Sequence, residues 1–474
     1  MAASKQKDKE NGLIMEQENS KTYLFEAMPI PRAVIQLSIP IVVSSLVTVI
    51  YNLADTFFVG MLNDPIQNAA VTLVYPVMLA FNAVNNLFGV GTSSMMSRSL
   101  GSGDYEKVRK CSAFGFYGAM FSGLLFSLLC TFFRTPLLRL LGADGTTLEA
   151  TANYMFWTVC CGAMPAILNV VQGYMVRSEG ASLHASIGTM SGCILNILLD
   201  PIFILPWGLN MGAAGAGLAT FLSNCVACGY FLTLARVKKG RTFVCMDIRK
   251  LKVLSRDIVL GIFGVGIPAS IQNLLNVVGS TILNNFTAAY GASAVAAMGV
   301  AQKLNMIPMQ MALGFSQGIM PLVSYNYASG DRKRMKHSIL FAMGIVIPAM
   351  LLVTVGYSLD APALVRLFME NPEIVDYGAR FLRVMCLGTA FICVDFLAVG
   401  VFQSLGMGKN ALIFAILRKI VLEIPLLLVM NAVYPLYGLP YAQFITEVVL
   451  SIAALVMLSR IFKQEGPQVQ PERK

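Results

Sequence analysis

Apolar runs separated by short polar stretches recur along almost the whole chain, from about residue 32 to residue 462. Each run has about eighteen residues or more, enough to cross a hydrocarbon layer roughly 30 Å thick as a helix. Strict alternation of apolar and polar residues, which is typical of membrane barrels, is missing from them. The sequence therefore predicts an all-α membrane protein. The twelve predicted transmembrane helices are 33–60, 69–99, 111–133, 151–177, 183–206, 211–236, 257–289, 293–327, 338–359, 378–405, 410–434 and 437–462.

The two halves of the chain resemble each other. A shift of about 225 residues places Ile39-Pro40 on Ile267-Pro268 and Gly103-Asp104 on Gly330-Asp331. Because each half has an even number of spans, the halves are expected to be parallel repeats around a central cleft. The expected regions are a tail at 1–32, a six-helix lobe at 33–236, a linker at 237–256, a second six-helix lobe at 257–462 and a tail at 463–474.

Charge separates the two sides of the predicted membrane domain. Most of the 35 Lys and Arg residues fall in the tails, the linker and the other loops of one side. The opposite loops hold only Arg134, Arg139 and Arg366. By the positive-inside rule, both termini and the linker are expected to be cytoplasmic in a multi-pass protein of the bacterial inner membrane. The net charge of +10 is thus explained by topology, and we expect no nucleic-acid partner.

Polar residues at helical spacing predict which faces of the spans turn inward, because polar groups are costly in lipid. Hydrogen bonds between helices are the alternative explanation for any single one of these side chains. Met306 belongs to a methionine-rich span, and methionine suits both core packing and a site that accepts many apolar cations. The residues expected to line a substrate cavity are Asn52, Asn82, Asn86, Asn273, Asn276, Lys303, Met306 and Gln317.

Carboxylates inside predicted spans are stronger candidates for function, since each costs about 2.5 to 3.5 kcal/mol at a helix centre. Glu423 follows Lys419 by four residues, which favours an ion pair. Asp200 directly precedes Pro201 and has a capping role as its alternative. Asp55 has no basic residue on its own span, and we expect it to handle a cation. Burial favours the protonated carboxyl, while carboxylate, amide and hydroxyl oxygens together can bind sodium.

Several motifs, in order along the chain, resemble those of the MATE (multidrug and toxic compound extrusion) family, and most closely its bacterial MepA-like members in the DinF-like branch. The resemblance extends from about residue 31 to residue 462. Its motifs are Ile39-Pro40, Tyr51-Asn-Leu-Ala-Asp55, Gly101-Ser-Gly-Asp104, Arg177-Ser-Glu-Gly180, Asn196-Ile-Leu-Leu-Asp200-Pro, Gly215-Ala-Gly-Leu-Ala-Thr220, Gly318-Ile-Met-Pro321 and Asn326-Tyr-Ala-Ser-Gly-Asp331.

The resemblance implies a secondary active exporter of cationic or hydrophobic small molecules, driven by inward H⁺ or Na⁺. The family's ion site carries over to Asp55, Asn196, Asp200 and Thr220, with a hinge at Pro40. Asp395, eight residues before Gln403, resembles a carboxylate used by another branch, so it is a possible second site. A monomer without a cofactor, and without a metal other than possible Na⁺, is expected.

Two other functions compete with export. A lipid-linked oligosaccharide flippase can share the two-lobe architecture, but its cavity should be rich in Arg and Lys, whereas this predicted interior is acidic and amide-rich. An enzyme is not expected, because His184 and His337 both lie at predicted span ends and form no catalytic motif. Cys225 and Cys228, although spaced as CxxC, lie inside a predicted span and are interpreted as buried thiols.

Overall fold

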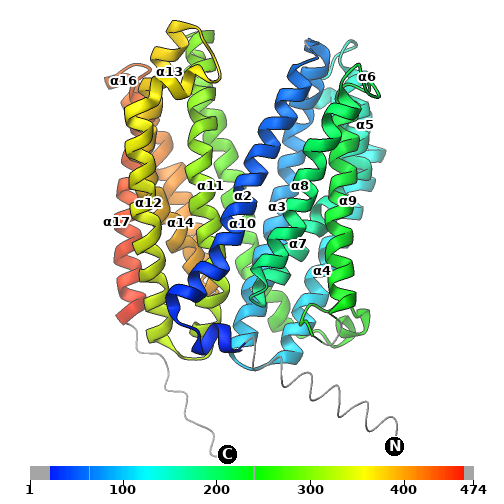
Figure 1. The fold of residues 1–474 in the computed structure, drawn as a ribbon, viewed down its shortest axis with the longest axis vertical. Helices are drawn as coiled ribbons and strands as arrows, with labels where there is room; N and C mark the ends of the chain where they lie inside the picture. Colours follow the sequence, from blue (N-terminus) through cyan, green and yellow to red (C-terminus); the bar gives the residue numbers. More distant parts are fainter. Residues whose placement is uncertain (1–21, 63, 239–240, 464–474) are drawn as a thin grey trace, which may run out of the picture. The chain divides into compact units, whose positions relative to one another are not determined.

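The computed structural model describes residues 22–62, 64–238 and 241–463, and their regular secondary structure is entirely helical. Residues 1–21 and 464–474, which make up most of the two predicted tails, lie outside the described part, as do linker residues 239 and 240. Figure 1 shows the helices in order along the chain.

The described helices divide into two compact units. The elements wholly within unit 1 are η1 (Tyr23–Ala27), α3 (Pro65–Gly101), α4 (Tyr105–Phe132), α5 (Arg134–Leu140), α6 (Leu148–Met155), η2 (Phe156–Cys161), α7 (Ala163–Ser178), α8 (Ser182–Ile204), α9 (Ala213–Val237) and η3 (Ile248–Val253). The elements wholly within unit 2 are α11 (Ala292–Ala328), α12 (Arg332–Arg366), α13 (Pro372–Leu387), α14 (Thr389–Ser404), α15 (Gly408–Ile416), η4 (Leu417–Glu423), α16 (Ile424–Val433) and α17 (Gly438–Lys463).

Two long helices are shared between the units. In α2 (Ile30–Gly60), residues up to Val42 belong to unit 2 and those from Val43 onward to unit 1. In α10 (Arg256–Ala288), residues up to Ser270 belong to unit 1 and the rest to unit 2. The expected lobe ranges, 33–236 and 257–462, assign each of these helices to one lobe. The units differ from those ranges because each shared helix packs with a different set of neighbours along its length.

Eight helices of the described chain are long and apolar enough to cross a membrane by themselves: α2, α3, α4, α8, α9, α10, α12 and α17. Two bent pairs also qualify, α6–η2 with α7 and α13 with α14, each with an angle of 46°. These ten segments correspond to ten of the twelve predicted spans. The other two predictions fall on α11 and on α15–η4–α16, whose membrane crossing stays a prediction.

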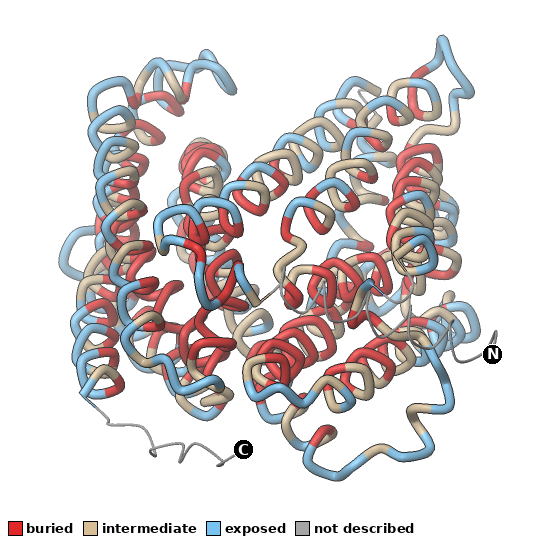
Figure 2. Tube along the Cα trace, turned by 60° about the horizontal axis from the view of Figure 1, so that its bottom comes forward, coloured by how far each residue is buried: buried red, intermediate tan, exposed pale blue. Residues whose placement is uncertain are grey.

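The surface of the helices is apolar over large areas. Phe121, Leu128 and Leu352 are more than half exposed, as are many other large apolar side chains. Along most helices, buried positions lie on one side and exposed positions on another (Figure 2). In water such a surface would promote association, whereas in a bilayer it meets lipid tails. The chain is a multi-pass, helical membrane protein.

The Gly-Asp landmarks of the repeat have the same local structure in both units. Gly103 and Gly330 have positive φ angles of 74° and 86°, which glycine adopts without steric strain. The following residues, Asp104 and Asp331, cap α4 and α12. Each side chain accepts one hydrogen bond from the backbone N–H three residues later, at 3.0 and 2.9 Å respectively. Each pair therefore ends one helix and begins the next.

The linker region is held against unit 1 by specific contacts. The Cys245 N–H donates to the Ser112 hydroxyl at 2.9 Å, and the Tyr117 hydroxyl donates to the Met246 carbonyl at 2.9 Å. The Phe243 ring stacks on the Tyr105 ring, with centroids 5.2 Å apart. The chain from residue 241 to the start of α10 therefore has a defined path along α4.

Candidate ion-binding site

Asp200 and Asn196 lie one helical turn apart on the same face of α8, and both side chains are buried. Thr220 lies opposite them on α9, the helix that packs most extensively against α8. With the Asn196 amide oriented to satisfy its neighbours, its nitrogen donates to Asp200 Oδ2 at 2.8 Å. Its oxygen accepts from the Thr220 hydroxyl at 3.2 Å and from the Thr220 N–H at 3.1 Å. The three residues thus form one polar cluster.

Asp55 approaches this cluster from the unit 1 part of α2. The carboxylates of Asp55 and Asp200 interact electrostatically with each other. Each of them also interacts electrostatically with the phenol groups of Tyr51 and Tyr154. Tyr51 lies one turn before Asp55 on α2 and within hydrogen-bonding reach of Thr220. Atom Oδ1 of Asp55 is buried and has no hydrogen-bond partner within the described residues. The four residues predicted to form the ion site therefore come together in unit 1.

The arrangement can bind a small cation. Two carboxylates close together in a buried environment repel each other, and a proton or a monovalent cation between them removes that repulsion. The Asp55 oxygen without a hydrogen-bond partner is available for the bound ion. Carboxylate, amide and hydroxyl oxygens from three helices make a donor set that fits a hard cation as well as a proton.

Pro40, the predicted hinge, lies inside α2 fifteen positions before Asp55. Proline lacks the N–H that would bond to the preceding turn, so the helix is weakened at this point. Pro40 belongs to the part of α2 that packs in unit 2, whereas Asp55 belongs to the part that packs in unit 1. A change at Asp55 can thus reach unit 2 along a continuous helix.

Asp395, the possible second ion-site residue, is already paired. Its Oδ2 atom accepts from Arg418 Nη1 at 3.2 Å, and Arg418 Nε donates to Glu447 Oε1 at 2.9 Å. Next to this group, Lys419 Nζ lies 2.6 Å from Glu423 Oε2, as the four-residue spacing predicts. All five side chains are buried. Arg418 therefore compensates the charge of Asp395 through Oδ2, whereas Asp395 Oδ1, like Asp55 Oδ1, is buried without a hydrogen-bond partner among the described residues. The role of Asp395 as a second ion site stays a prediction.

The eight predicted cavity residues divide between the units. Asn52, Asn82 and Lys303 are exposed, while the other five are partly buried. The first three in sequence lie in unit 1 and the remaining five in unit 2. Their role as a substrate surface stays a prediction. All ten cysteines are free thiols.

The sequence model of the MatE family matches residues 40–202 and again residues 268–429. The chain belongs to this family. The two MatE matches begin at Pro40 and Pro268, the two prolines that the internal repeat superposes. The halves are thus two copies of one MatE unit, and the predicted membership of the MATE family is confirmed.

Curated MATE relatives extend over the same region. The multidrug export protein MepA of Staphylococcus aureus strain MRSA252 is 32% identical over 445 residues, which cover 93% of this chain and 96% of that protein. MepA of Staphylococcus saprophyticus is 31% identical over 441 residues, with the same coverage.

Solved structures of a MATE transporter and of a MOP superfamily transporter have the same fold. An outward-facing multidrug resistance MATE family transporter of the MOP superfamily superposes with a TM-score of 0.88 at 27% identity, covering 93% of this chain and 97% of that one. A MOP superfamily transporter from Pyrococcus furiosus superposes with a TM-score of 0.85 at 26% identity, again covering 93% and 97%.

Three residues of the two charged clusters in this MATE chain were not predicted from sequence. Tyr51 shares a helix face with Asp55 at a four-residue spacing, so that spacing could have indicated it. Tyr154 lies on α6, and nothing in its local sequence places it near Asp55. Arg418 was not predicted to pair with Asp395, because the two residues come from different helices.

Proposed function

We propose that this chain is a secondary active multidrug exporter that moves cationic or hydrophobic small molecules out of the cell in exchange for inward H⁺ or Na⁺. The observation that supports this most directly is the pair formed by buried Asp200 and partly buried Asp55, with Asn196 and Thr220 beside it. The names of the MepA relatives, which are multidrug export proteins, support the direction and breadth of transport. They do not favour the flippase alternative.

In this proposal, ion binding and drug binding favour different arrangements of the protein. A bound ion neutralises the Asp55–Asp200 pair and changes the free energy of the unit 1 part of α2. Because α2 continues into unit 2 through Pro40, that change alters how the two halves of the helix are held. Exchange follows if binding of the ion disfavours binding of the drug, since such coupling is reciprocal.

The driving force is sufficient. One charge moving through 100 mV releases about 2.3 kcal/mol, and tenfold accumulation of a neutral solute requires about 1.4 kcal/mol. A single ion per cycle can therefore sustain a gradient of roughly fortyfold. We further propose that the protein works as a monomer in the bacterial inner membrane with both termini in the cytoplasm, without a bound cofactor.

The test is transport into proteoliposomes that carry an imposed pH or sodium gradient, with ethidium as a fluorescent cationic probe. Asp55→Asn is expected to keep the fold and to reduce gradient-driven transport to near zero, because the amide cannot take up a proton and lacks a charge for Na⁺. Asp395→Asn is expected to be milder, since Arg418 already compensates Asp395. Asp257→Asn, at an exposed position near the start of α10, serves as the matched control.

The two gradients identify the coupling ion. Transport by the unaltered protein that responds only to the pH gradient, or only to the sodium gradient, assigns H⁺ or Na⁺. Full gradient-driven transport by Asp55→Asn at normal protein levels would overturn this mechanism.

A further inference from the structure

A pocket of about 220 Å³ opens at one end of unit 2, whereas the predicted ion site belongs to unit 1. It lies between the second half of α13 and the start of α17, at the end of α17 opposite Lys463 (Figure 1). Its walls come from three segments. The lining residues are Arg380, Phe381, Arg383 and Val384 of α13, Tyr434 and Tyr437 of the turn between α16 and α17, and Tyr441 of α17.

The two arginines have different partners. Arg380 lies over the Tyr437 ring, 5.2 Å from its centroid, and its Nε is 3.2 Å from a carboxylate oxygen of Asp376. This ion pair is about half exposed on both sides, so it is weak and can open. Arg383 donates through Nε to the Ser358 carbonyl at 3.1 Å. The two terminal nitrogens of Arg383 have no hydrogen-bond partner among the described residues.

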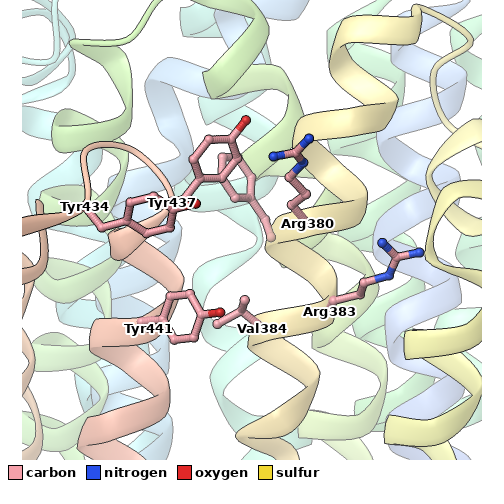
Figure 3. Close-up of a pocket in the computed structure, with 7 residues that line it drawn as sticks. Arg380, Arg383, Val384, Tyr434, Tyr437 and Tyr441 are labelled. Atoms are coloured by element: carbon pink, nitrogen blue, oxygen red, sulfur yellow. The ribbon is translucent and has the colours of Figure 1, made fainter.

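Tyrosines form the opposite wall. Figure 3 shows Arg380 beside Tyr437, with Tyr434 and Tyr441 across the pocket, while the Arg383 guanidinium lies farther out at the rim. Guanidinium groups present paired N–H donors that match phosphate oxygens, and phenol hydroxyls add further donors. The lining therefore combines the Arg380 guanidinium and three hydroxyls around a space large enough for a phosphate group, with the Arg383 guanidinium at its rim.

The pocket also has an apolar exit. Val384 is one of its lining residues, and Leu387 follows one turn later on the same face of α13 with 44% of its surface exposed. The pocket lies beside the start of α17 and the turn that precedes it, and tyrosine and arginine side chains at such span ends meet lipid headgroups. A free anion needs only the polar part, whereas an amphiphile uses both the polar part and the apolar strip beyond it.

We propose that this pocket binds the phosphate group of a phospholipid headgroup, with an acyl chain lying along Val384 and Leu387. The opened form of the Arg380–Asp376 pair faces the phosphate, Arg383 reaches it by turning inward from the rim, and the tyrosine hydroxyls hold its remaining oxygens. The inference does not depend on the coupling ion or on the transported substrate.

The test uses the purified full-length protein in detergent and follows thermal unfolding as a function of added ligand. The ligands are phosphatidylglycerol, diacylglycerol with the same acyl chains, and inorganic phosphate. Phosphatidylglycerol is expected to raise the unfolding temperature at low concentration, while the two others have little effect because each lacks half of the recognised group. The double variant Arg380→Gln/Arg383→Gln should need roughly tenfold more lipid for each arginine removed.

Two further variants separate binding from folding. Arg366→Gln removes an exposed arginine that does not line the pocket and should respond to the lipid like the unaltered protein. Tyr441→Phe removes one hydroxyl and keeps the ring, so a smaller loss of lipid affinity is expected. Unchanged lipid dependence in the double variant would overturn the site, and equal stabilisation by inorganic phosphate would overturn the lipid as its ligand.

Discussion

Ser38 on α2 and Gly318 on α11 are packed so closely that a Cβ atom added to Gly318 would lie 2.5 Å from the Ser38 Cα atom. Both residues belong to unit 2. Their contact holds the first part of α2 against α11, only two residues before Pro40. In unit 1, a Cβ atom on Gly91 would lie 2.4 Å from the Ile262 carbonyl oxygen of α10. Each of the two shared helices, α2 and α10, therefore packs closely against a glycine of a neighbouring helix.

Gly318→Ala is expected to destabilise the protein by about 1 to 3 kcal/mol, because the backbone of α2 must move to make room for the methyl group. Thermal unfolding of the purified protein measures the effect. Gly299→Ala is the matched control on the same helix, since no atom lies within 4 Å of a Cβ added there. Alanine favours the helix, so the control should be unchanged or slightly more stable. Equal stability of the two variants would contradict the packing argument.

Arg418→Gln is expected to destabilise the protein by about 3 to 5 kcal/mol, because it leaves Asp395 and Glu447 buried without a compensating charge. The unfolding temperature in detergent provides the measurement. Adding Glu447→Gln to the same protein removes one of the uncompensated carboxylates and should recover part of the loss. A double variant no more stable than Arg418→Gln alone would show that the charge network is not the cause.

Lys303→Met is expected to change which substrates are exported while leaving the unfolding temperature nearly unchanged, because Lys303 is exposed near the start of α11. Loss of this positive charge should favour more strongly cationic compounds. Export of a panel that varies in charge at similar size measures the effect. The same preference across the panel in both proteins would remove Lys303 from the substrate surface.

A cysteine placed at Lys252, in a protein whose native cysteines are replaced, should not react with a membrane-impermeant thiol reagent in intact cells. This outcome follows from the charge bias that predicts a cytoplasmic linker. Lys252 is exposed in η3, so poor access within the protein does not explain a failure to react. Reaction after the membrane is opened provides the positive control, and labelling in intact cells would reverse the predicted topology.

Ten of the twelve predicted spans correspond to segments with the length and apolar character of membrane crossings. The pattern of apolar runs found them because lipid requires long, uninterrupted apolar helices, and this requirement acts on each segment alone. The segment α15–η4–α16 does not meet the same criterion and contains the charged residues Arg418, Lys419 and Glu423. These charges are compensated by ion pairs inside unit 2, and the three side chains are buried. The amino-acid composition of the segment alone does not indicate this burial.

The sequence by itself determined the helical membrane class, the duplication, the family, and a candidate site made of Asp55 and three other residues. These properties depend on local composition, on spacing along one helix and on motif order. Only the tertiary structure decided that Tyr154 lies near Asp55, that Arg418 pairs with Asp395, and that α2 and α10 each pack in two units. Those relationships join residues from different helices, and side-chain packing between helices, which no single segment specifies, selects them.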